Sequence, residues 1–209
     1  IRHRIPGMFC KKLKHLIEEN SPRLFKKLVR TEFQENFKDF SVIDSPVIKK
    51  FVENFVSGMY IDNRHIHNPV VTNEYIESYQ RGEIRYHNNH DPTPFYPKPI
   101  YTHTDSDRML YFYGSDYLFN SLLYHAYQTN KLSIKINKEN LSDKYRGFLS
   151  TACPGSVAVK DFTSSICVGK LIPIIGETYP NTTTSFLLLP HELPDFQFNG
   201  DAGAIKLSS

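Results

Sequence analysis

Apolar residues recur at helical spacing over residues 8–19. Phe9, Leu13, Leu16 and Ile17 fall on one face, and lysines and Glu18 occupy the positions between them. Ser21 and Pro22 follow; Ser is a good N-cap, and Pro is pre-set for the first helical position. A second helix therefore begins here, or one long helix is kinked. The apolar stripe continues through Leu24, Phe25, Leu28 and Val29.

Further along the chain, helical and extended patterns alternate. Residues 46–57 and 116–128 have helical spacing, the second with Leu118 and Leu122 on its apolar face. Residues 131–137 alternate strictly, which predicts a half-buried strand with Leu132, Ile134 and Ile136 on one face. Residues 165–177 predict an apolar helix that contains Pro173. Short strands are predicted at 82–86, 108–113, 184–189, 195–198 and 204–207, and the class is α+β.

Prolines at 92, 94, 97 and 99 interrupt these patterns. Each lacks a backbone donor and favours an extended predecessor, so the stretch predicts a stiff connector. A metal site is suggested by the pair His65 and His67 and by His87, His90 and Asp91. Their polar, turn-rich surroundings and wide spacing favour solvated side chains, and we expect no metal.

Charge is unevenly distributed in this chain of 209 residues with net charge +3. Residues 1–30 contain nine Lys or Arg side chains against Glu18 and Glu19. Such a segment suits anionic surfaces, although a solvated helix face explains it as well. No nucleic-acid-binding motif accompanies it, and we expect no nucleic-acid partner.

The sequence also lacks the common signatures of enzymes. It has no nucleophile elbow, no phosphate-binding loop and no dinucleotide fingerprint. Cys153 before Pro-Gly resembles a reactive thiol on a turn, but nothing near it in sequence would lower its pKa. The spacing of Cys10, Cys153 and Cys167 does not predict zinc. We expect no catalysis and no cofactor.

Two sequons, at Asn140 and Asn181, favour a secreted glycoprotein. No apolar run approaches the roughly 18 residues that a transmembrane helix needs. The chain does not begin with Met, so we interpret it as a piece of a longer protein.

One family shares several of these features. "GEIRYHNNHDPTPFYPKPI" followed by "DRMLYFYGSDYLFNSLLYHAYQTNKLSIKI" resembles the lipid-transfer/lipopolysaccharide-binding family, which includes bactericidal/permeability-increasing protein, lipopolysaccharide-binding protein, phospholipid transfer protein and cholesteryl ester transfer protein. "CKKLKHLIEENSPRLFKKL" resembles its long first-barrel helix, and "TSSICVGKLIPIIGETYPN" resembles a helix of the second half. The most specific part is Asp107 to Asn120.

The resemblance implies a fragment of a two-barrel tubular fold, with long amphipathic helices on curled antiparallel sheets. Residues 1–88 would end the first barrel, 89–106 would be the linker and 107–209 would begin the second barrel. Cys10 lies at the family's disulfide position, and its partner would be upstream. Cys153 and Cys167 are not family positions; a bond between them is possible.

The implied function is lipid binding or transfer by a secreted, monomeric protein in lipid transport or innate immunity. Acyl chains of phospholipid or lipopolysaccharide would lie in apolar slots. By analogy, Leu13, Leu16, Ile17, Leu24 and Leu28 would line the first slot, and Leu118, Leu122, Leu132 and Ile134 the second; each can equally be a core residue. The alternative is a secreted module that binds anionic membrane surfaces through the basic helix without taking up lipid.

Overall fold

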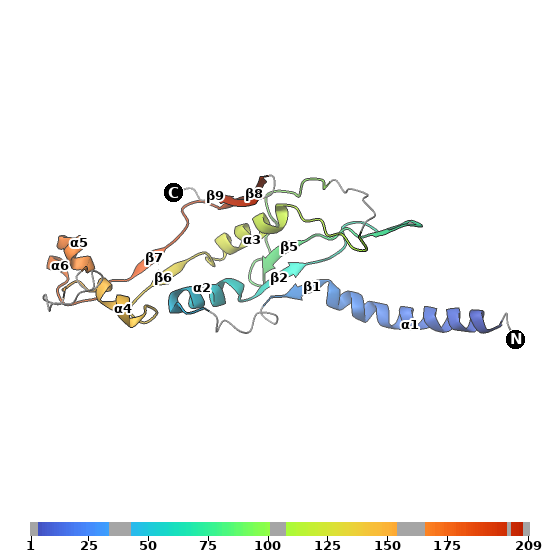
Figure 1. Ribbon diagram of the computed structural model, residues 1–209, viewed down its shortest axis with the longest axis horizontal. Helices are drawn as coiled ribbons and strands as arrows, with labels where there is room; N and C mark the ends of the chain where they lie inside the picture. The colour runs from blue at the N-terminus through green and yellow to red at the C-terminus, as the bar shows by residue number, and fades with distance from the viewer. Residues whose placement is uncertain (1–3, 34–42, 101–107, 154–165, 200–201, 207–209) are drawn as a thin grey trace. The chain divides into compact units, whose positions relative to one another are not determined.

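The computed structural model describes residues 4–33, 43–100, 108–153, 166–199 and 202–206 (Figure 1). Within the first helix, the description of side chains leaves out residues 4–8 and 24–28. The chain divides into two compact units, which are described separately below. Unit 1 comprises Ile1–Asn36 and Gly58–His125, and unit 2 comprises Phe37–Ser57 and Ala126–Ser209.

Unit 1 combines one long helix with an antiparallel sheet. Helix α1 (Arg4–Leu28) leads directly into strand β1 (Arg30–Glu32), as Figure 1 shows. The sheet has the order β1-β2-β5, with β2 at Met59–Asp62 and β5 at Glu83–Tyr86. Strands β3 (Val70–Val71) and β4 (Ile76–Glu77) form a separate antiparallel pair.

Helix α3 (Tyr117–Gln128) begins in unit 1 and joins its sheet through both apolar packing and hydrogen bonds. The Ile84 backbone N–H donates to Oγ of Ser121 over 3.0 Å, and that hydroxyl donates to the Leu118 carbonyl over 2.9 Å. Ser121 is fully buried, so this pairing satisfies a polar group that would otherwise be costly to bury. The apolar core around it consists of Met59, Ile84, Tyr86, Tyr117 and Leu123.

The same sheet buries two carboxylates directly opposite each other. Asp62 and Glu83 are register partners in β2 and β5 and are only 4% and 3% exposed. Arg81 Nη1 lies 3.6 Å from Asp62 and 3.7 Å from Glu83, so one guanidinium serves both carboxylates. The arrangement offsets a like-charge pair that would otherwise destabilise the sheet.

Each carboxylate also has partners of its own. Arg64 donates to both oxygens of Asp62. Glu83 Oε1 lies 3.0 Å from Nε of Arg85 and 3.1 Å from Nε2 of the buried His125. Burial by itself would raise the pKa of Asp62, but the hydrogen bonds from Arg64 outweigh it and lower that pKa. Burial by itself would also raise the pKa of Glu83. The hydrogen bond from His125 and the charges of Arg85 and Arg81 outweigh this effect, so the pKa of Glu83 is lowered.

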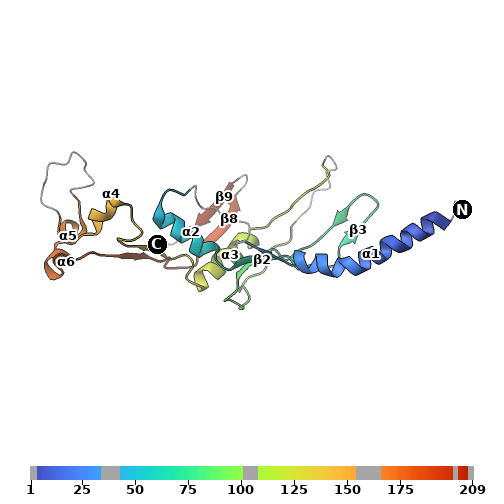
Figure 2. The same ribbon diagram turned by 90° about the horizontal axis from the view of Figure 1, so that it is seen from below.

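The described helices of unit 2 are shorter than α1. Its helices are α2 (Pro46–Val56), the last residues of α3, α4 (Asp143–Arg146), α5 (Val168–Leu171) and α6 (Pro173–Thr178), with a 3₁₀ turn η1 (Gly147–Leu149). Strands β6 (Ile134–Ile136) and β7 (Phe186–Leu188) pair antiparallel. Strands β8 (Asp195–Asn199) and β9 (Ala202–Lys206) form a second pair, seen side by side in Figure 2.

Most of the predicted elements are present. Residues 8–19 lie within α1, which continues as one helix through Pro22. The predictions at 46–57, 82–86 and 116–128 correspond to α2, β5 and α3, and those at 184–189, 195–198 and 204–207 overlap β7, β8 and β9. The alternating stretch 131–137 is a strand only over Ile134–Ile136. The α+β class holds, and the sheets among the described residues are open pairs or triplets.

Two predictions of secondary structure were wrong. Residues 108–113 have no regular secondary structure, because no strand in the described part of the chain pairs with them; Met109 and Phe112 are among the most exposed apolar side chains. The predicted helix at 165–177 is two short helices separated at Ile172, whose φ of −128° and ψ of 84° are not helical. Pro173 accounts for this break, since proline disfavours helical geometry in its predecessor.

Candidate binding pocket

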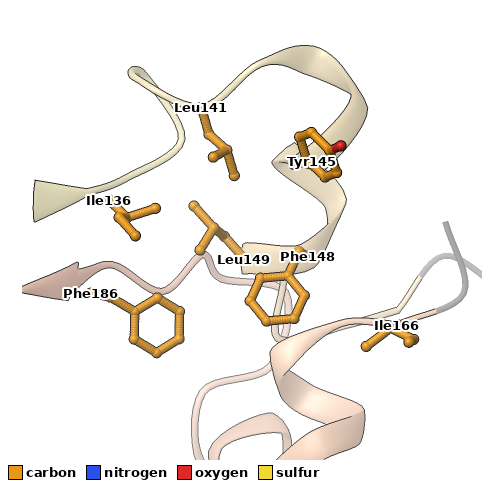
Figure 3. A pocket seen from close by; sticks show the side chains of 7 residues that line it. All are labelled: Ile136, Leu141, Tyr145, Phe148, Leu149, Ile166 and Phe186. Atoms are coloured by element: carbon orange, nitrogen blue, oxygen red, sulfur yellow. The ribbon is translucent and has the colours of Figure 1, made fainter. Parts of the chain in front are cut away.

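An apolar pocket of about 330 Å³ lies in unit 2. Side chains from the β6–β7 pair and from the α4–η1 segment converge on it, with one more from the start of the α5 region (Figure 3). Its volume is at the lower end of the range typical of small-molecule sites. The lining residues are Ile136, Leu141, Tyr145, Phe148, Leu149, Ile166 and Phe186.

The two strands supply one wall through a direct cross-strand pair. Ile136 and Phe186 are register partners, so their side chains project on the same face. The ring of Phe148 from η1 lies 6.4 Å from the Phe186 ring, centroid to centroid, in a tilted arrangement. Leu149, which is fully buried, completes the contact between this wall and the helical turn.

A reciprocal asparagine turn directs the chain from β6 into α4. The Asn137 N–H donates to Oδ1 of Asn140 over 2.8 Å, and the Asn140 N–H donates to Oδ1 of Asn137 over 3.1 Å. Nδ2 of Asn140 also donates to the Lys135 carbonyl over 2.5 Å. These bonds fix the turn that places Leu141 in the pocket.

Residues 149–151 are held against residues 182–184 opposite them. Thr151 is buried; its hydroxyl accepts from the Thr182 N–H over 2.8 Å, and its own N–H donates to the Thr182 carbonyl over 3.0 Å. The Thr184 N–H donates to the Leu149 carbonyl over 2.8 Å. This short ladder connects η1 to the strand that carries Phe186.

A disulfide and a close backbone approach position the remaining lining residue. Cys153 and Cys167 are bonded, and the buried Cys167 directly follows Ile166. Gly169 packs so tightly that an added Cβ would lie 1.7 Å from the Thr151 carbonyl oxygen. The α5 segment is therefore attached to residues 151–153 both covalently and by packing.

The side chains predicted to line lipid slots lie elsewhere. Leu13, Leu16 and Ile17 are exposed on α1, and the side chains of Leu24 and Leu28 lie outside the described residues. Leu132 and Ile134 of unit 2 are half-buried, as are Leu118 and Leu122 in the part of α3 that belongs to unit 1. None of these four lines the pocket.

Sequence reasoning missed the pocket because its lining comes from separate short segments. One signal was available: Ile136 belongs to the alternating stretch 131–137, on the same face as Leu132 and Ile134. Leu141, Phe148 and Leu149 follow in the sequence, and their spacing matches neither a helical nor a strand period that would place them on one face. Phe186 becomes part of the pocket only through its pairing with Ile136.

The other candidate residues have ordinary structural surroundings. His87 lies within hydrogen-bond distance of Arg30 and 3.1 Å from Oε2 of Glu32. In the parts of the chain that the structure describes, no group of three or more His, Cys, Asp or Glu side chains is arranged to hold a metal ion. No described helix has the length and apolar character that crossing a membrane requires. Cys10 is an exposed, free cysteine on α1.

Comparison with known proteins identifies the family. Residues 54–208 match the family model described as "LBP / BPI / CETP family, C-terminal domain". The chain belongs to the LBP/BPI/CETP family. Within that family, it is 27% identical to the human cholesteryl ester transfer protein over 160 residues, which are 68% of this chain and 31% of the human protein. The chain thus matches about a third of the length of this relative.

Proposed function

We propose that this chain is part of a secreted lipid-binding or lipid-transfer protein and that the unit 2 pocket holds an acyl chain. The observation that supports this proposal is a pocket of about 330 Å³ lined by six aliphatic or Phe side chains and one Tyr. Burying a chain there gains about 0.8 kcal/mol for each methylene removed from water. Membership of a family that includes the cholesteryl ester transfer protein points to the same ligand class.

The finer expectations belong to this proposal. The protein would have two tubular barrels joined by the proline-rich stretch 89–106, with residues 1–88 in the first and 107–209 in the second. Phospholipid or lipopolysaccharide would supply the acyl chains, in lipid transport or innate immunity. The apolar stripe of α1 and the inward residues of α3 and β6 would line further slots.

Filling the pocket tests the proposal. Ile166→Trp places an indole in the pocket, and Ile174→Trp makes the same change on α6, where Ile174 is exposed and outside the lining. Native mass spectrometry would compare lipid retained by the purified variants, and circular dichroism would check their folding. We expect Ile166→Trp alone to lose bound lipid. Equal lipid in both variants, or none in the parent chain, would contradict the proposal.

A second candidate function has support from α1. Phe9, Leu13, Leu16 and Ile17 are all exposed on one helix, and lysines flank them. Such a helix can lie in the interface of an anionic membrane. In that case the protein would be lipid-free after purification and would bind phosphatidylserine vesicles less well as salt is raised.

A further inference from the structure

A second pocket of about 270 Å³ shares a wall with the apolar one in unit 2. Leu141 and Tyr145 line both, so the two pockets adjoin along these side chains. Both linings are largely apolar, but the second also contains a carboxylate and the hydroxyl groups of two serines. Its residues are Asp44, Ser45, Pro46, Val47, Leu141, Ser142 and Tyr145.

The serine hydroxyl groups of this second pocket make no capping hydrogen bonds to the helices that they precede. Ser45 and Ser142 occupy the N-cap positions of α2 and α4, where a serine side chain normally accepts a hydrogen bond from the first helical turn. Neither side chain makes that capping bond here. Together with the Tyr145 phenol, they offer a ligand both donors and acceptors.

The charge of the lining favours some ligands over others. The exposed Asp44 contributes a carboxylate, and no Lys or Arg is among the lining residues. The N-terminus of α2 offsets about half a charge at most, so the carboxylate dominates. On α4, Lys144 lies over the Tyr145 ring at 5.6 Å from its centroid, and Arg146 is paired with Asp143.

We propose that the second pocket binds the polar head group of the lipid whose chain occupies the first, and that it selects a donor-bearing head group without net negative charge. The hydroxyls of such a head group would donate to Asp44 and exchange hydrogen bonds with Ser45 and Ser142. A phosphate there would face the Asp44 carboxylate and be repelled. This inference rests on the proposed function, because it needs an acyl chain in the neighbouring pocket. It narrows the ligand of these two pockets to a lipid without phosphate, in place of the phospholipid or lipopolysaccharide of the wider proposal.

Two probes isolate the head group. 1-Oleoylglycerol and 1-oleoylglycerol 3-phosphate have the same chain and the same glycerol and differ only by the phosphate. Each is titrated separately, at matched free concentration below its micelle-forming range, against the full 209-residue chain. We expect a Kd about tenfold lower for 1-oleoylglycerol, the change that one partly offset charge repulsion near a protein surface produces.

Removing the carboxylate tests the assigned residue. Asp44→Asn keeps the shape of the side chain and leaves the α2 N-terminus and the hydroxyls to favour an anion, so we expect the preference to disappear or reverse. Glu177→Gln is the matched control, since Glu177 is an exposed carboxylate on α6 outside both pockets. Ser45→Ala with Ser142→Ala should weaken binding of 1-oleoylglycerol about threefold to tenfold, as lost hydrogen bonds do.

The outcomes separate this inference from the proposed function. If neither probe binds the parent chain, the proposed function itself fails. Suppose that both probes bind the parent chain and that Ile166→Trp abolishes their binding. If the ratio of their Kd values is then the same in Asp44→Asn as in the parent chain, the acyl-chain pocket is supported and the head-group assignment is overturned. A parent chain that prefers the phosphate probe would overturn it as well.

Discussion

At the scale of single residues, Gly169 matters more than its sequence suggests. It has no side chain to lose, yet it lies where an added Cβ would overlap the Thr151 carbonyl oxygen at 1.7 Å. Backbone cannot move aside as a flexible side chain can, so the α5 segment and residues 149–151 would have to separate. Gly147 provides a contrast in the same unit, because a Cβ there meets nothing within 4 Å and its backbone is helical.

We therefore expect Gly169→Ala to lower the free energy of unfolding of unit 2 by about 1–3 kcal/mol, the usual cost of overpacking. Gly147→Ala should be neutral or stabilise by about 0.4–1 kcal/mol, because alanine restricts the unfolded chain. Urea unfolding of both variants measures the difference. Equal midpoints for Gly169→Ala and the parent chain would show that the two segments are not packed as described.

The two sequons also differ at this scale. Asn140 is 6% exposed and its Nδ2, the atom that carries an N-linked glycan, is engaged by the Lys135 carbonyl. Asn181 is exposed, in a turn with φ of 57°. If the chain is secreted from animal cells, we expect a glycan on Asn181 and little on Asn140. Asn181→Gln should remove the glycosidase-sensitive mass shift, and Asn140→Gln should leave it; the reverse pattern would contradict the described turn.

At the scale of elements, the sequence predicted what depends on local pattern. Helices α2 and α3 follow from periodicity, because each has its apolar positions at helical spacing on one face, half-buried in α2 and partly buried in α3. The strand expected at 108–113 failed because extended structure needs a partner strand, which local sequence does not supply. The pocket was missed for a related reason: Ile136, Phe148 and Phe186 meet only through strand pairing and a 3₁₀ turn.

The disulfide also acts at the scale of elements, because it links the segment that carries Ile166 covalently to Cys153. Cys153 and Cys167 are 14 residues apart, and closing such a loop stabilises the folded state by about 3 kcal/mol in the chain-entropy account. We expect Cys153→Ala with Cys167→Ala to lose about that much stability and to retain less lipid. Cys10→Ala is the control, because that cysteine is exposed and free. Unfolding midpoints and native mass spectrometry under non-reducing conditions measure both effects.

At the scale of the whole molecule, the two units owe their stability to different interactions. Unit 1 buries an ionic cluster between β2, β5 and α3, whereas unit 2 relies on a disulfide and apolar packing around its pocket. The family could be inferred from residues 82–100 and 107–136 because their sequence is distinctive. The ionic cluster could not be inferred from the sequence, because Asp62, Arg64 and Glu83 resemble ordinary surface charges until the strands pair.

This difference predicts that acid weakens unit 1 before unit 2. The pKa values of Asp62 and Glu83 are lowered in the folded chain from about 4 in an unfolded one, so their contribution is complete above that pH and is lost as pH falls through the folded values. Hydrogen exchange, corrected for its intrinsic pH dependence, should show that amides of β2 and β5 lose protection below about pH 4 while those of β6 and β7 keep theirs. Asp62→Asn with Glu83→Gln should lower the stability of unit 1 at neutral pH and flatten its dependence on pH. A parallel loss of protection in both units, unchanged in that double variant, would show that the buried carboxylates do not control the acid response.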